Sequence, residues 1–146
     1  MLSEDLRWIE PERLACFRRL LPSVTTTAAK PLDLFDSPFP EGYPAIWQWD
    51  VETGQGTTRT IALFNMNERM RTFRVSPDMF GIDEDAEWVA LEWWQNRWLG
   101  RKSGEFTVDV PPLDVAVIHG KPTMDTPSIV SCSHHPSGMY ILETEG

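Results

Sequence analysis

The chain has 146 residues, of which 41% are hydrophobic and 24% are charged, and its formal net charge is −9. This length favours one domain with a core of its own, and the negative charge disfavours binding to nucleic acid or to an anionic membrane surface. No apolar run approaches the roughly 18 residues that a membrane helix needs. The N-terminal segment carries early acids and lacks the apolar region of a signal peptide. We therefore expect a cytoplasmic protein.

The N-terminal segment, residues 1–22, has the helical pattern. Pro11 suits the first position of a helix, and Pro22 ends it. Between them, apolar side chains recur at intervals of three and four residues and form a stripe on one side of the helix: Leu14, Phe17, Leu20 and Leu21. A helix of about three turns is marginal alone in water. We expect this stripe to form an interface with the sandwich described below, with a partner domain or with a second copy.

After this helix, the chain reads as short strands separated by turn residues. The alternation of apolar and polar residues, or short apolar runs, predicts about eight strands: 45–51, 59–66, 70–75, 89–93, 105–110, 113–119, 128–132 and 139–143. Strands do not alternate with helices, so we predict an all-β fold, an antiparallel Greek-key β-sandwich with a short N-terminal helical segment. We divide the chain into residues 1–30, helix and linker, and residues 31–146, the sandwich.

The segment 87–120 has the clearest strand pattern, and we predict a β-meander there with a turn at residues 100–104. Alternation from Val89 to Trp93 places Val89, Leu91 and Trp93 toward the core. Trp88 and Trp94 then lie on the opposite face, and Glu92 lies on the polar side of the strand.

Seven tryptophans are many for a chain of this length. On an exposed sheet face, Trp88, Trp94 and Trp98 would offer flat rings on which sugar rings stack. The other interpretation is that the N-terminal helix or another domain covers this face, because large exposed aromatic patches usually mark interfaces.

The spacings that carry common catalytic and metal chemistry are absent from the sequence. Among its three histidines, adjacent His134 and His135 would point to opposite faces of an extended chain, and no Cys-x-x-Cys or His-x-x-x-His spacing occurs. There is no glycine-flanked serine nucleophile and no phosphate-binding loop before a helix. We predict no catalytic residue, no metal and no cofactor. Cys16 and Cys132 lie beside apolar residues, so we interpret them as free, buried thiols.

Two acids stand beside tryptophans, which is one appearance of a glycosidase site. Asp50 follows Trp49, and Glu92 precedes Trp93. Asp50 comes just before a loop, where acids are common, and Glu92 falls on the predicted polar side of its strand. We interpret both acids as structural.

Several motifs follow one another in a fixed order along the chain. The first two are LSEDLRWIEPERLACFRRLLPSV and AKPLDLFDSPFPEGYPAIWQW, and the later ones are ALFNMNERMRTFRV, LEWWQNRWLG, FTVDVPPLDVAVIHGKP and SCSHHPSG. Together they resemble the α-galactosidase-like glycoside hydrolases of the melibiase clan. The first two are similar to the end of the catalytic barrel and the exit from it, and the later ones are similar to the sandwich that follows. Leu113 stands where this pattern often has histidine, and Cys132 stands where threonine is usual.

The resemblance implies that the chain is the C-terminal β-sandwich of such an enzyme together with the last helix of the barrel. In that family both catalytic aspartates lie on barrel strands upstream of the matching region, so the isolated chain is expected not to be an enzyme. The implied partner is the catalytic barrel domain of a glycoside hydrolase. Self-association through the N-terminal helix is a further possibility, and the alternative function is a stand-alone carbohydrate-binding module that uses Trp88, Trp94 and Trp98.

Overall fold

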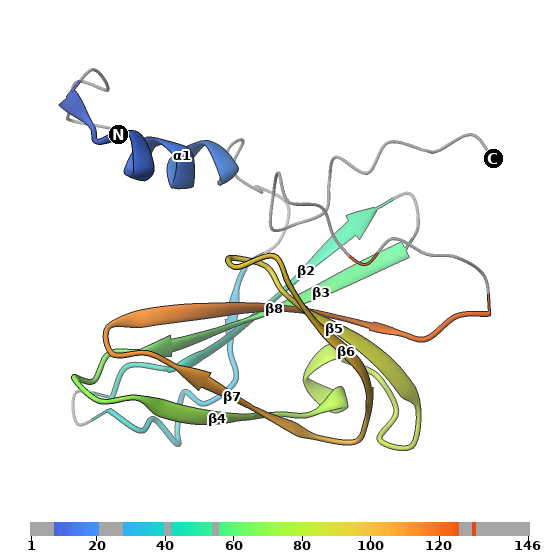
Figure 1. Ribbon diagram of the computed structural model, residues 1–146. Coiled ribbons are helices and arrows are strands. Elements are labelled where there is room, and N and C mark those ends of the chain that lie inside the picture. The colour runs from blue at the N-terminus through green and yellow to red at the C-terminus, as the bar shows by residue number, and fades with distance from the viewer. Residues whose placement is uncertain (1–7, 21–27, 40–41, 54–55, 126–129, 131–146) are drawn as a thin grey trace, which may run out of the picture.

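The computed structural model describes residues 8–20, 28–39, 42–53, 56–125 and 130 (Figure 1). It contains the α-helix α1 (Pro11–Arg19) and the 3-10 helix η2 (Pro77–Phe80). Within these residues eight strands occur: β1 (Lys30–Pro31), β2 (Ile46–Thr53), β3 (Gly56–Asn65), β4 (Arg71–Val75), β5 (Glu87–Glu92), β6 (Arg97–Ser103), β7 (Phe106–Val110) and β8 (Asp114–Pro122).

The strands form two antiparallel sheets. The larger sheet has six strands in the order β1-β2-β3-β8-β5-β6, and the smaller sheet consists of β4 and β7. The prediction of an all-β, antiparallel sandwich-like fold with a short helix is therefore confirmed. The Greek-key order stays a prediction, because the predicted strands at 128–132 and 139–143 lie, except for Val130, outside the described residues.

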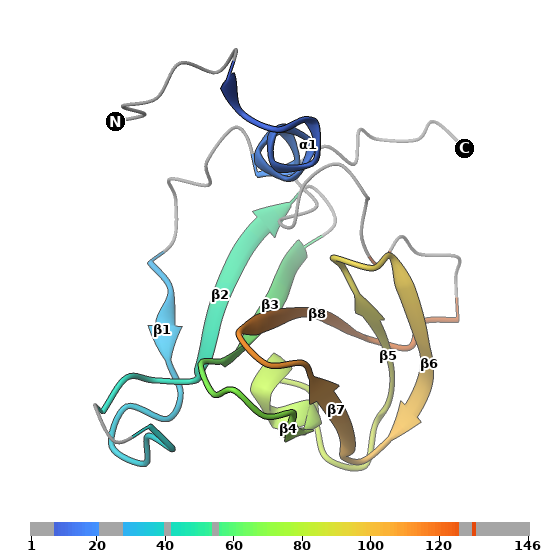
Figure 2. The same cartoon turned by 60° about the vertical axis from the view of Figure 1, so that its left-hand side comes forward.

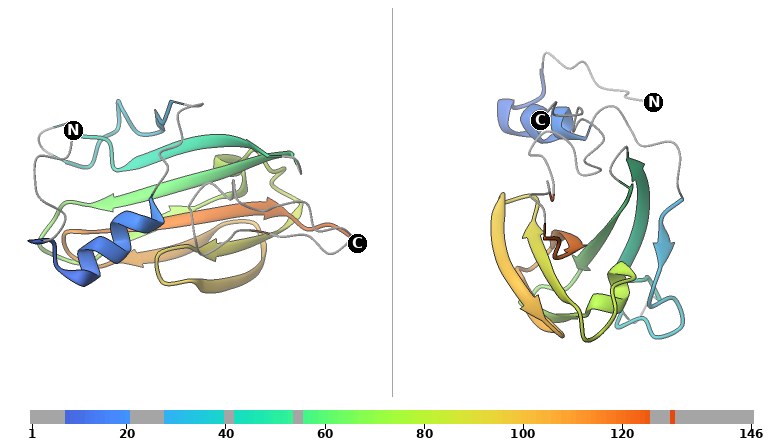
Figure 3. Two further views of the ribbon diagram at one scale, coloured as in Figure 1. Left: turned by 90° about the horizontal axis from the view of Figure 1, so that it is seen from above. Right: turned by 90° about the vertical axis from the view of Figure 1, so that its right-hand side faces the viewer.

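Helix α1 begins at Pro11, as predicted. Glu12 lies in its first turn, and Arg18 and Arg19 lie in its last turn, where their charges complement the helix dipole. The helix lies on the side of the six-stranded sheet that faces away from β4 and β7 (Figures 1 and 2). Two further views show it on the same side (Figure 3).

The main core fills the space between the two sheets, and Trp88 of β5 is its largest side chain. Trp88 is fully buried, with ring centroids 5.2 Å from Phe80 and 5.5 Å from Phe106. Its indole N–H donates to the carbonyl of Gly104 at 3.1 Å, so the polar end of the ring is satisfied inside the core. The strands contribute alternate residues around it: Ile61, Leu63, Phe73, Val75, Ala90, Val108, Val110, Ala116 and Ile118.

The predicted faces of segment 89–93 are wrong. Trp88 and Ala90 point into the main core, whereas Trp93 belongs to a second cluster outside it. The strand carries apolar residues on both faces, so its period alone does not identify the core side. Strand β5 also ends at Glu92, so the alternation does not extend to the residues after it.

The predicted β-meander in segment 87–120 is also wrong. Residues 100–103 of the predicted turn belong to β6, and the chain reverses instead at residues 93–96, where Asn96 has a φ of 50°. Gly100, with a φ of 89°, lies at an irregularity in the pairing of β5 with β6, where a bulge uses the conformational freedom of glycine. After β6 the chain leaves the six-stranded sheet, because β7 pairs with β4 in the smaller sheet. It then returns to the larger sheet, where β8 pairs with β5.

A buried asparagine, Asn65, joins the two sheets at one end of the sandwich. The two N–H groups of its side-chain amide are shared among the carbonyls of Arg69, Val110 and Pro111, whose oxygens lie 2.8 to 2.9 Å from the amide nitrogen. Its carbonyl accepts from the backbone N–H of Asn67 at 3.1 Å. One fully buried side chain thereby ties the turn after β3 to the end of β7.

Asp50 and Arg59 face each other across β2 and β3. Arg59 donates to the two carboxylate oxygens of Asp50, from Nε at 2.6 Å and from a terminal nitrogen at 2.8 Å. This bidentate hydrogen bond, opposed in part by burial, lowers the pKa of the Asp50 carboxyl below its ordinary value of 3.8. The same bond raises the pKa of Arg59.

We expect Trp88→Ala to lower the free energy of unfolding by about 3–5 kcal/mol, because it leaves a large cavity in the core. The matched control Trp98→Ala should change it by less than about 0.5 kcal/mol, because Trp98 is 55% exposed. Urea denaturation followed by circular dichroism measures both. Equal losses for the two variants would contradict the placement of Trp88.

We expect the Asp50–Arg59 pair to give a pH-dependent stabilisation of up to about 1 kcal/mol. The pKa of Asp50 is lower in the folded chain, so this stabilisation is complete well above pH 3.8 and is lost as the pH falls through the folded pKa. The stability difference between the parent chain and Asp50→Asn should therefore shrink on acidification. Denaturation at a series of pH values measures it, with the exposed Asp85→Asn as the control, and a difference that is independent of pH would contradict the pairing.

Candidate functional site

The face of the six-stranded sheet that lies away from β4 and β7, here called the outer face, is apolar as well. In β3, Ile61 and Leu63 belong to the main core, whereas Ala62 belongs to the second cluster and Phe64 is 36% exposed. Strand β3 is therefore a central strand with apolar residues on both faces. The second cluster gathers side chains from several elements: Trp47, Trp49, Ala62, Trp93, Trp94, Val115 and Val117.

A groove of about 620 Å³ crosses the outer face, here called the outer groove. It runs over β2, β3 and β8 and meets the turn between β5 and β6. None of the described residues that line it is charged: Ala29, Tyr43, Pro44, Trp47, Trp49, Ala62, Phe64, Met66, Trp94, Val115 and Val117. An uncharged aromatic and aliphatic surface of this kind is typical of an interaction site.

The turn between β5 and β6 is held by the buried carboxylate of Glu92. The carboxylate accepts backbone N–H groups from Trp94 at 3.2 Å, from Gln95 at 2.7 Å and from Val117 at 3.3 Å. The side chain is 1% exposed, so its predicted position on the wet side of the strand is wrong. The reason is that a carboxylate can lie buried where several N–H donors meet it. Glu92 thereby fixes the tryptophan-bearing turn against β8.

The two tryptophans of this turn form a pair at the rim of the outer groove. Trp93 is 1% exposed and packs with Ala62 and Val117. The Trp94 ring meets it edge-on, with ring centroids 4.8 Å apart, and lines the groove.

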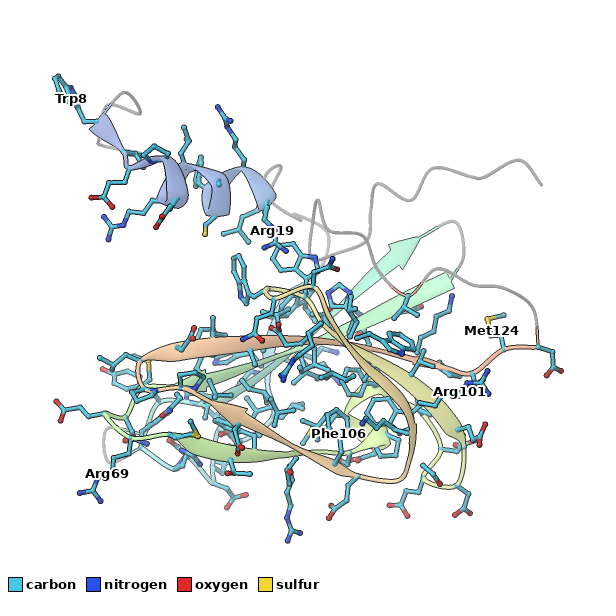
Figure 4. All side chains as sticks on the ribbon, viewed as in Figure 1. Trp8, Arg19, Arg69, Arg101, Phe106 and Met124 are labelled. Atoms are coloured by element: carbon cyan, nitrogen blue, oxygen red, sulfur yellow. The ribbon has the colours of Figure 1, made fainter. Side chains whose placement is uncertain are left out.

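Helix α1 reaches this rim through Arg19. Figure 4 shows the side chain extending from the C-terminal end of the helix toward the tip of the β5–β6 hairpin. Its guanidinium donates to the carbonyls of Trp93 at 2.8 Å and Trp94 at 3.0 Å. The guanidinium carbon lies 4.0 Å from the ring centroid of Trp93 and 5.3 Å from that of Trp94, at cation–π distance.

The three tryptophans predicted to bind sugar do not lie together. Trp88 is in the main core, so its predicted exposure is wrong and it is not available to a ligand. Trp94 lines the outer groove. Trp98 pairs with Leu91 on the outer side of β6 but is not part of the groove lining. The groove instead contains Trp47 and Trp49, which alternation along β2 places on one face of the sheet. Sugar binding by Trp94 and Trp98 stays a prediction.

The helical residues predicted to form an interface are only partly covered. Leu14 and Phe17 are half-buried and Leu20 is 41% exposed, while Leu21 lies outside the described residues. The prediction that Cys16 is buried is wrong, because this free thiol is exposed on α1. Cys132 lies outside the described residues.

In the part of the chain that the structure describes, no cluster of three or more His, Cys, Asp and Glu side chains is arranged to bind a metal ion. His119 is fully buried in β8, and His134 and His135 lie outside that part. None of the described helices has the length and apolar character needed to cross a membrane.

We expect Glu92→Gln to lower the free energy of unfolding by about 1–3 kcal/mol. The amide NH₂ that replaces one carboxylate oxygen does not accept hydrogen bonds, so a buried backbone N–H loses its partner. The control is Glu87→Gln, which removes an exposed carboxylate from the same strand. Urea denaturation at neutral pH compares the two, and an unchanged stability of Glu92→Gln would show that the carboxylate does not hold the turn.

Comparisons with known proteins find similarity among solved structures. A scan against protein-family models gives no match, and a search of the curated proteins gives none. The α-galactosidase I of Mortierella vinacea is 17% identical over 51% of this chain and 20% of that chain, with a TM-score of 0.45. A GH27 β-L-arabinopyranosidase from Geobacillus stearothermophilus is 19% identical over 57% of this chain and 19% of that chain, with a TM-score of 0.46. The isomalto-dextranase of Arthrobacter globiformis T6 is 23% identical over 66% of this chain and 16% of that chain, with a TM-score of 0.46.

The chain thus spans about a fifth of the length of the solved structures that it matches. These structures include α-galactosidase-like glycoside hydrolases, which are the enzymes that the sequence motifs resemble.

Proposed function

We propose that the chain is a non-catalytic β-sandwich domain that packs on the catalytic barrel of a glycoside hydrolase through its outer groove. The observation that carries this proposal is the uncharged apolar groove on the same side of the sheet as α1. By the motif resemblance, α1 corresponds to the last helix of such a barrel. A barrel that includes α1 would therefore lie on the same side of the sheet as the groove.

The chemistry of the outer groove favours a protein over a sugar. Sugar and other small-ligand sites place several polar groups to fix the orientation of the ligand. In the groove, the indole N–H of Trp47 already donates to the carbonyl of Pro44 at 3.1 Å. Among the lining residues that the structure describes, Tyr43 alone carries a side-chain hydroxyl. The centre of a protein interface is instead depleted in charge and rich in Trp, Tyr, Phe and Met, which is the composition of this lining.

The two acids that stand beside tryptophans have structural contacts, which supports a non-catalytic role. Asp50 accepts two hydrogen bonds from Arg59, and Glu92 accepts three backbone N–H groups. Neither contact is the arrangement of a general acid or a nucleophile aimed at a substrate. Together with the upstream position of the catalytic aspartates in the family it resembles, this supports a chain that does not cleave glycosides by itself.

A stand-alone carbohydrate-binding module is the second candidate, and the exposure of Trp98 favours it. This ring is 55% exposed on β6. It shares the outer face with the groove, because Trp98 lies opposite Leu91 and Leu91 lies opposite His119. A sugar chain that bridged Trp94 and Trp98 would use both rings.

We expect the chain to form a one-to-one complex when it is co-expressed with an α-galactosidase-like barrel domain from the same genome. Phe64→Glu should weaken this complex about 100-fold, because it places a charge in the apolar contact. The control is Met124→Glu, which adds the same charge at a residue that is 52% exposed and not in the groove lining. Light scattering after size exclusion and calorimetric titration measure the complex. Equal affinity for both variants would contradict docking through the groove.

A titration with galacto- and gluco-oligosaccharides at millimolar concentration, followed by tryptophan fluorescence, separates the two candidates. The proposed function predicts no saturable change. A saturable change that Trp94→Ala abolishes would establish the binding module instead. The isolated chain should also release no aryl group from an aryl α-galactoside after repurification, and activity that survives repurification would overturn the non-catalytic role.

A further inference from the structure

The contact between Arg19 and the β5–β6 turn has the form of a guanidinium-binding site. Two successive backbone carbonyls, of Trp93 and Trp94, accept from two different nitrogens of the guanidinium. The ring of Trp93 lies 4.0 Å from the guanidinium carbon. The planar fork of arginine matches two adjacent acceptors and an aromatic ring at once, and the ammonium of lysine does not.

The residues of this site are held in place by contacts that do not involve Arg19. The Glu92 carboxylate accepts the N–H groups of Trp94 and Gln95, and the N–H of Trp93 donates to the carbonyl of Val117 at 2.8 Å. The Trp93 ring packs with Ala62 and Val117 in the second cluster. The site therefore belongs to the sandwich, and Arg19 enters it from the helix.

The covalent connection between α1 and the sandwich is long. The segment from Leu20 to Ala29 joins the helix to β1. Its ten residues would span up to roughly 35 Å if fully extended, so its length by itself permits many directions of α1. The contact between Arg19 and the Trp93–Trp94 turn is one that can select a direction.

We propose that Arg19 and the Glu92-supported Trp93–Trp94 turn form a latch that sets the orientation of α1, and of any domain continuous with α1, relative to the sandwich. Arg19 is a positioning residue: it joins the C-terminal end of the helix to the rim of the outer groove, where Trp94 is also part of the lining. The link to a barrel rests on the proposed function, whereas the latch itself is a property of this chain. Arg19 would align the helix while the groove supplies the apolar contact area.

The test measures the distance between α1 and the sandwich in the full chain. Both natural thiols are replaced, Cys16→Ser and Cys132→Ser, and spin labels are attached at Arg13→Cys on the helix and at Ser103→Cys at the end of β6, both exposed positions. Pulsed electron spin resonance should then give a single narrow distance distribution. Arg19→Ala should give a broad one. Arg19→Lys should also broaden it, because lysine keeps the positive charge and the helix propensity but not the fork.

The matched control is Arg18→Ala, which removes an exposed arginine from the same last turn of the helix and should leave the distribution narrow. Circular dichroism on each variant records the helix content. It distinguishes a variant in which α1 has unfolded from one in which α1 is folded but no longer held against the sandwich. Tryptophan emission should change in Arg19→Ala and not in Arg18→Ala, because only Arg19 lies over the rings. A narrow distribution in Arg19→Ala or Arg19→Lys would overturn the latch.

This experiment is independent of the barrel. If the chain binds a barrel and Arg19→Ala keeps its narrow distribution, the latch fails and the docking function stands. If no barrel binds and Arg19→Ala broadens the distribution with the helix content intact, the latch stands and the docking function fails.

Discussion

The six-stranded sheet is apolar on both of its faces, and this constraint shapes the rest of the molecule. Strand β3 shows it most directly, with Ile61 and Leu63 in the main core and Ala62 and Phe64 on the opposite side. A sheet of this kind needs cover on both sides. Strands β4 and β7 cover one face and create the core around Trp88. The other face carries the outer groove and lies toward α1, and this is the face through which we propose that the domain docks.

The outer face is organised by the buried carboxylate of Glu92. Glu92 brings the backbone of the β5–β6 turn and the backbone of β8 to one buried point. The turn then presents its two carbonyls and two indole rings to Arg19. An acid beside tryptophans can suggest glycoside chemistry, but here the carboxylate accepts three hydrogen bonds from backbone N–H groups. In this chain, the acid next to the tryptophans holds the β5–β6 turn against β8.

The parts of the fold that could be predicted from the sequence are those set by local pattern. Pro11 at the start of α1, the inward side chains Phe73 and Val75 of β4, and the two apolar faces of β3 all follow from helical or strand periodicity. The segment 87–120 could not be predicted in this way. Both faces of β5 are apolar, and the freedom of Gly100 serves a bulge within β6 where the sequence suggests a turn. Of the candidate site, only Trp94 was predictable. Arg19 binds the carbonyls of Trp93 and Trp94, which lie 74 and 75 residues further along the chain, so no local pattern relates them.

Local patterns are sufficient to predict an antiparallel β fold with one amphipathic helix and to show the resemblance to α-galactosidase-like enzymes. Long-range packing determines which of the seven tryptophans lie in the core and which form a surface. Trp88 and Trp94 are both expected on one sheet face by alternation, yet Trp88 is buried between Phe80 and Phe106 and Trp94 lines a groove. Strand periodicity fixes only that neighbouring side chains point to opposite faces. Which side becomes the interior depends on contacts between segments that are distant in sequence. Strand β7 pairs with β4 in the second sheet, and Glu92 accepts the N–H of Val117 in β8.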